Sequence, residues 1–82
     1  MNQKKIVRVQ TGIRIEKNIL KVLKGTAAEL EISLGDLLEG IILHAFEGKQ
    51  PFNKKTLEFI ETIRQAYGLE LTADDSHNLI EN

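Results

Sequence analysis

Residues 7–15 have the sequence Val7-Arg8-Val9-Gln10-Thr11-Gly12-Ile13-Arg14-Ile15, and the predicted fold depends on them. The odd positions are β-branched and mostly apolar, whereas the even positions are polar, basic or glycine. Such alternation is typical of a half-buried β-strand, because successive side chains of a strand point to opposite faces. β-Branched side chains also suit a pleated surface. The pattern predicts a strand with one apolar face and one polar, basic face.

No second segment of the sequence has comparable strand character. The backbone groups of a lone strand need hydrogen-bonding partners, and its apolar face needs a cover. A second copy of the chain would supply both. The chain has 82 residues, of which 41% are hydrophobic, so it is one small domain that buries a modest core by itself. We therefore predict a homodimer.

Basic charge is concentrated near the N-terminus, although the net charge of the chain is only -1. Residues 1–25 contain seven lysines and arginines and one glutamate, which gives a net charge of +6. Residues 26–48 carry a net charge of -5, and residues 49–82 carry -2. The positive charge therefore lies on and beside the predicted strand, as expected of a surface that meets phosphates.

A first amphipathic helix is predicted from about Lys17 to about Leu30, with Asn18 as its expected cap. A helix that ends at Gly25 and restarts at Thr26 is the alternative. We favour a single helix because the apolar stripe keeps its phase across Gly25.

The second helix is predicted to begin after Ser33, where Ser33-Leu34-Gly35-Asp36 resembles a capping box, and to end at Gly48. Its apolar stripe is wider than one short helix covers, which again favours a second chain. The stripe consists of Leu34, Leu37, Leu38, Ile41, Ile42, Ala45 and Phe46.

The order of strand, helix, tight turn and N-capped helix over residues 6–47 resembles the ribbon-helix-helix DNA-binding proteins of the Arc and MetJ repressor type. The resemblance implies a mostly α fold with one β-strand, in which an intertwined homodimer forms a two-stranded antiparallel ribbon. Residues 1–48 would then be a DNA-binding and dimerisation domain, and residues 49–82 a C-terminal helical extension. The implied function is a sequence-specific transcriptional regulator, a repressor, whose ribbon enters the DNA major groove.

The resemblance also implies roles for individual residues. Base contacts fall on the outward strand positions Arg8, Gln10, Gly12 and Arg14. Phosphate contacts fall on the start of the second helix and on nearby lysines, namely Ser33, Leu34, Gly35, Lys4, Lys5 and Lys17. The implied dimer core consists of Val9, Ile13, Ile15, Leu34, Leu38, Ile41 and Ile42.

Three positions depart from the family pattern. Gly12 has no side chain with which to read a base, and Glu31 stands where the family often has a glycine between the helices. Asp36 adds negative charge near the implied phosphate site. Arg8 and Arg14 also have a purely structural interpretation as solvated charges that discourage aggregation at a strand edge.

A third helix is predicted after residues 49–51, with Asn53 as its cap and Gly68 as its end. It either packs back on the dimer, which we favour, or forms an arm for another protein. Residues 69–82 contain either a short capped helix or a disordered end. Two further functions stay open: an antitoxin-like protein whose residues 53–82 bind a toxin, and a ribbon-helix-helix interaction module that does not bind DNA.

Nothing in the sequence indicates an enzyme. Cysteine is absent, and His44 and His77 do not have the spacing of metal ligands. We therefore expect neither a cofactor nor a metal. The sequence has neither a signal peptide nor an apolar run of membrane-spanning length, so we expect a soluble cytoplasmic protein.

Overall fold

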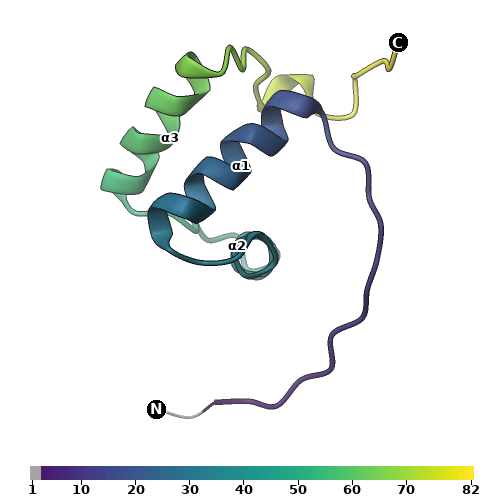
Figure 1. The fold of residues 1–82 in the computed structure, drawn as a ribbon, viewed down its shortest axis with the longest axis vertical. Helices are drawn as coiled ribbons and strands as arrows, with labels where there is room; N and C mark the ends of the chain where they lie inside the picture. The colour runs from purple at the N-terminus through teal and green to yellow at the C-terminus, as the bar shows by residue number, and fades with distance from the viewer. Residues whose placement is uncertain (1–2) are drawn as a thin grey trace.

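The computed structural model describes residues 3–82 and consists of an extended arm followed by three α-helices (Figure 1). The helices are α1 (Lys17–Leu30), α2 (Leu34–Phe46) and α3 (Lys54–Ala66), and a single 3-10 turn, η1 (Ala73–Asp75), follows them. α1 packs against both α2 and α3. Residues 3–15, which we call the N-terminal arm, leave the start of α1 and curve past α2 (Figure 1).

The predicted ribbon-helix-helix fold with one β-strand and an antiparallel ribbon is wrong. Residues 3–82 form three helices and no strand. Residues 3–15 make no backbone–backbone hydrogen bond to any other part of the described chain. A strand exists only through such bonds to a neighbour, so the period of two in residues 7–15 produces an extended arm with two different sides.

The prediction that α1 continues through Gly25 is confirmed. A Cβ atom at Gly25 would lie 3.2 Å from Cδ1 of Ile63, so the absence of a side chain allows α3 to approach α1 closely. The predicted cap is wrong, because Glu16 and not Asn18 precedes the first turn. Oε1 of Glu16 accepts the N–H groups of Asn18 and Ile19, each at 2.9 Å, and these two hydrogen bonds lower the pKa of the Glu16 carboxyl.

The predicted caps of the other two helices are confirmed. Oγ of Ser33 accepts the N–H of Asp36 at 3.1 Å, and Oδ1 of Asn53 accepts the N–H of Thr56 at 2.9 Å. Each bond satisfies a backbone donor that the first turn of a helix leaves without a partner. α3 lies on α1 within the same chain, which corresponds to the packed alternative for this segment.

The turn between α1 and α2 places Glu31 in the left-handed region, with φ of 58° and ψ of 40°. The N–H of Glu31 donates to the Ala28 carbonyl, and the N–H of Ile32 donates to the Ala27 carbonyl at 3.0 Å. This is the Schellman arrangement of a helix end, whose left-handed position favours glycine. Glu31 therefore carries backbone strain that a glycine would not.

Replacing Glu31 with glycine should raise the free energy of unfolding by up to about 1 kcal/mol, because it relieves the left-handed strain. Chemical denaturation measures the change. Glu29→Gly is the matched control: the same substitution inside the last turn of α1 should lower stability by about 1 kcal/mol. Equal losses at both positions would show that the turn is not strained.

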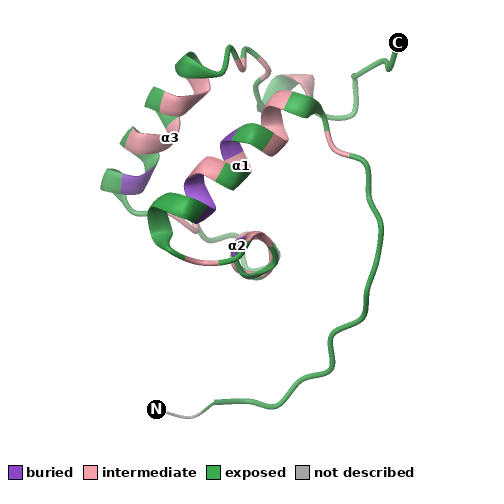
Figure 2. Cartoon of the chain, viewed as in Figure 1, coloured by how far each residue is buried: buried purple, intermediate pink, exposed green. Residues whose placement is uncertain are grey.

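The hydrophobic core of the described chain is small. Its buried hydrophobic residues are Val22, Ala27 and Leu37, and the fully buried Thr26 donates its hydroxyl to the Val22 carbonyl at 2.8 Å (Figure 2). The accessible surface is 7423 Å², against about 5,000 Å² expected for a folded monomer of this mass. The radius of gyration is 14.1 Å, against about 12 Å for a compact chain of this length. None of the helices described is long and apolar enough to cross a membrane.

Candidate nucleic-acid interface

The N-terminal arm keeps the two-sided character that its sequence predicts. Its apolar side is open to solvent, with Val7 91%, Val9 81% and Ile13 68% exposed. Only Ile15, at the base of the arm, is half-buried, and the rest of the arm is exposed throughout (Figure 2). The polar side carries Arg8, Gln10, Gly12 and Arg14, the residues predicted to contact bases.

Arg8 holds the arm to α2 through a two-point ion pair. Its Nε and Nη2 atoms donate to the two carboxylate oxygens of Glu39 at 2.9 and 3.0 Å. This bond lowers the pKa of the Glu39 carboxyl, and together with the nearby charge of Asp36 it raises the pKa of the Arg8 guanidinium. Solvent reaches both side chains, with 68% of the Arg8 side chain and 42% of the Glu39 side chain accessible, so the pair orients the arm without contributing much to stability.

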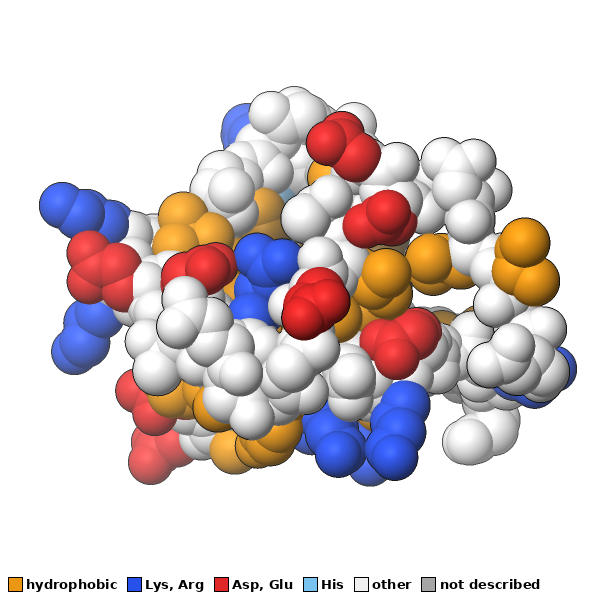
Figure 3. All heavy atoms as spheres, turned by 90° about the horizontal axis from the view of Figure 1, so that it is seen from above, with side chains coloured by type: hydrophobic (Ala, Val, Ile, Leu, Met, Phe, Trp, Pro, Cys, Tyr) orange, Lys and Arg blue, Asp and Glu red, His pale blue; other side chains and the backbone are white. Residues whose placement is uncertain are grey.

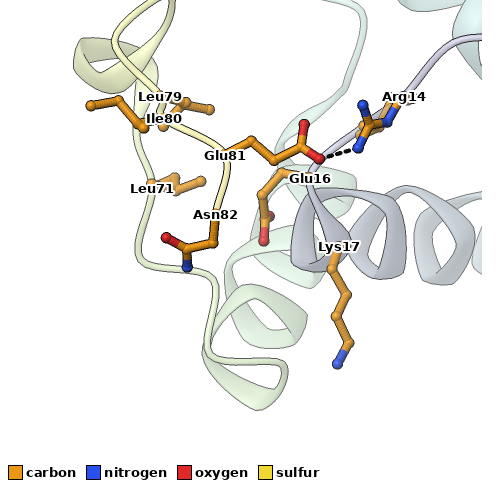
Figure 4. A pocket seen from close by; sticks show the side chains of 9 residues that line it. Arg14, Glu16, Lys17, Leu71, Leu79, Ile80, Glu81 and Asn82 are labelled. Carbon is orange, nitrogen blue, oxygen red and sulfur yellow. Dashed lines mark hydrogen bonds and ion pairs between the residues drawn. The ribbon is translucent and has the colours of Figure 1, made fainter.

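Arg14 lies at the base of the arm and pairs with Glu81, near the C-terminus (Figure 4). The two residues are 67 positions apart in the sequence. Both side chains line a cleft of about 630 Å³, whose rim combines basic and acidic side chains with aliphatic ones. Lys17, at the start of α1, belongs to the same rim. The arm base, the start of α1 and the end of the chain thus meet at one place.

The predicted phosphate site at the start of α2 lies near Arg8, in the middle of the arm. The hydroxyl of Ser33 is already used to cap the helix, which leaves the N–H groups of Leu34 and Gly35 without a hydrogen-bonding partner among residues 3–82. Gly35 and Glu39 share a face of α2, because they are one turn apart. The ion pair to Glu39 therefore brings Arg8 within about one helical turn of this site. The negative charge of Asp36 also acts on Arg8 there.

The predicted base-contact residues follow the arm from α2 to the cleft. Arg8 lies beside α2, whereas Arg14 and Lys17 line the cleft. Gln10 and Gly12 lie between them on the exposed arm. Lys4, Lys5 and Lys17 take part in no ion pair within the described part of the chain, so their ammonium groups are available to an external anion.

The residues predicted to form a dimer core are exposed or half-buried in the single chain. Val9, Ile13 and Ile42 are exposed, and Ile15, Leu34, Leu38 and Ile41 are half-buried. Leu43 and Phe46 of α2 are also open, 63% and 81% exposed. In the space-filling view, hydrophobic side chains reach the surface between charged ones (Figure 3).

Two residues of this region were not predicted from the sequence, and both are carboxylates. Glu39 and Glu81 are the partners of the two arginines of the arm. Each is separated from its arginine by at least 31 positions, so no local spacing indicates the contact. The charge asymmetry is the only sequence signal, because a segment of net charge +6 attracts the acidic remainder of its own chain.

Comparison of the chain with protein-family models, with curated proteins and with solved structures finds no match. Its function is therefore inferred from the contacts, exposure and charge of its own residues.

Proposed function

We propose that the chain is a cytoplasmic, homodimeric transcriptional regulator that binds DNA through its N-terminal arm. The observation that supports this function best is an extended segment, exposed from residue 3 to residue 14, that carries Lys4, Lys5, Arg8 and Arg14 in the part of the chain with net charge +6. An extended segment is narrow enough to follow a DNA groove, and basic arms of this kind contact both phosphates and base edges.

The side chains of the arm suit different tasks on DNA. Lys4 and Lys5 have no ion-pair partner among residues 3–82 and would neutralise phosphates, with release of the bound counterions. Arg14 would donate two hydrogen bonds to O6 and N7 of guanine, and Gln10 would pair with N6 and N7 of adenine. Gly12 adds no side chain and allows the backbone to approach the base edges closely.

A second copy of the chain is the partner that we propose for the apolar side of the arm. The accessible surface of the single chain is about 1.5 times that expected for a folded monomer of its mass. Exposed apolar side chains lie on the arm, whose valines and Ile13 are open, and on α2, with Leu43 and Phe46. A second copy of the chain would cover apolar side chains that the single chain leaves open. A dimer would also place two arms on neighbouring half-sites.

The salt dependence of DNA binding tests the role of the arm. We expect the double variant Lys4→Gln/Lys5→Gln to bind a duplex more weakly, and the slope of log K against log salt to become shallower by about one for each phosphate contact removed. Lys54→Gln/Lys55→Gln is the matched control, because it neutralises an adjacent pair of exposed lysines on the first turn of α3. Fluorescence anisotropy of a labelled duplex at several salt concentrations gives both values.

Equal slopes for the two double variants would contradict a DNA-binding arm. An absence of binding by the wild-type chain at low salt would contradict the function itself and would favour a protein-interaction module.

A further inference from the structure

We propose that the C-terminal tail, residues 76–82, competes with DNA for Arg14 and so limits the affinity of the arm. This inference rests on the proposed function, since it assigns a regulator to the same arm. The tail presents the Glu81 carboxylate to the Arg14 guanidinium (Figure 4). A carboxylate is the acceptor within the chain that most resembles the anionic and carbonyl oxygens of a nucleic acid.

Beyond Asn78, the tail makes one hydrogen-bonded contact with the rest of residues 3–82, the ion pair of Glu81 with Arg14. η1 holds the preceding segment in place, because the Asp75 carboxylate accepts the Thr72 N–H at 2.8 Å. Beyond η1, Leu79 is 52% exposed and Ile80 is 94% exposed, so little apolar burial fixes the end of the chain. The tail and the arm base both line the open cleft of about 630 Å³, and the ion pair joins them. The tail is therefore free to leave without disturbing the helices.

The two partners compete for one atom of Arg14. Its Nη2 donates to Glu81, and Nη2 belongs to both edges through which a guanidinium can make a two-bond contact to guanine. Arg8 differs in this respect, because its partner Glu39 is fixed on α2 and not on a movable segment. Release of the tail would thus free Arg14 to contact DNA and leave the ion pair of Arg8 unchanged.

The expected effect is modest because the pair is exposed, with 83% of the Arg14 side chain and 68% of the Glu81 side chain accessible. Exposed ion pairs contribute little, so Glu81→Gln should raise the affinity of the full chain for a duplex by about two- to fivefold. Glu58→Gln, at an exposed position of α3, is the matched control for the loss of one negative charge and should change the affinity less. In an Arg14→Ala background, the gain from Glu81→Gln should disappear.

A spin label tests the tail contact without relying on affinity. The chain has no cysteine, so Asn82→Cys provides a single attachment point for a nitroxide. In the free protein we expect paramagnetic broadening of the amides around Arg14, loss of that broadening in the Arg14→Ala variant, and its loss when a duplex is added. Broadening that persists at saturating duplex would overturn the competition, as would its absence in the free protein.

The affinity outcomes separate the two proposals. Suppose that the chain binds DNA, but that Glu81→Gln raises the affinity for the duplex no more than Glu58→Gln does, or raises it equally in the Arg14→Ala background. The proposed competition alone is then overturned. If no variant binds DNA, the proposed function fails and the competition fails with it.

Discussion

Replacing Leu37 with alanine should lower the free energy of unfolding by about 2–5 kcal/mol, the range for leucine-to-alanine changes in a core. Leu37 is 4% exposed and is the one buried residue of α2. Few other side chains are available to fill the cavity, because Val22 and Ala27 complete the buried hydrophobic core of residues 3–82. A small domain has a total stability of about 5–15 kcal/mol, so this single change should remove a large part of it.

Urea denaturation followed by circular dichroism measures this loss. Leu79→Ala is the control, because Leu79 is 52% exposed in the C-terminal tail and its truncation should cost no more than about 0.5 kcal/mol. Similar midpoints for the two variants would show that α2 does not pack on α1 through Leu37.

Replacing Val9 with aspartate should convert the proposed dimer into a folded monomer. Val9 is 81% exposed in the single chain, so the three helices do not depend on it. At the proposed interface between two copies, however, the new carboxylate would be buried without a partner. Burial of an unpaired charge costs several kcal/mol, so the dissociation constant of the dimer should rise by about 100-fold or more.

Sedimentation equilibrium across a range of protein concentrations measures the dissociation constant, and far-ultraviolet circular dichroism reports the helices. Gln10→Asp is the matched control, because it places the same charge on the next residue, on the polar side of the arm. We expect this control to stay dimeric. A monomeric wild-type chain, or equal weakening by both variants, would contradict an interface on the apolar side of the arm.

The helices and most of their caps were predictable because the causes are local. The apolar stripe of α1, the hydroxyl of Ser33 and the amide of Asn53 each act within one or two turns of sequence. The cap of α1 was missed because glutamate is not among the preferred capping residues, whereas Asn18 is of a preferred type. Gly25 was predicted to lie inside a helix. The sequence did not explain why a glycine stands there, because the cause is the close approach of Ile63 in the tertiary structure.

The arm shows the limit of a periodic pattern. The alternation from Val7 to Ile15 predicted a β-strand, and that prediction is wrong because the pattern does not supply a hydrogen-bonding neighbour. The expected β-ribbon is therefore absent from residues 3–82. The contacts of Arg8 with Glu39 and of Arg14 with Glu81 depend on where the helices and the tail place carboxylates, which no spacing in the sequence encodes.

Selection from a random pool of double-stranded DNA tests the central claim, DNA recognition by the arm, most directly. The purified wild-type chain is compared with Arg14→Ala and Arg14→Lys at near-physiological salt. Lysine keeps the charge of arginine but loses the two-bond geometry, so it separates base recognition from phosphate contact. We expect the wild type to enrich a short repeated half-site, and both variants to lose preference at one base pair of it. Failure of the wild type to enrich any sequence would contradict the claim.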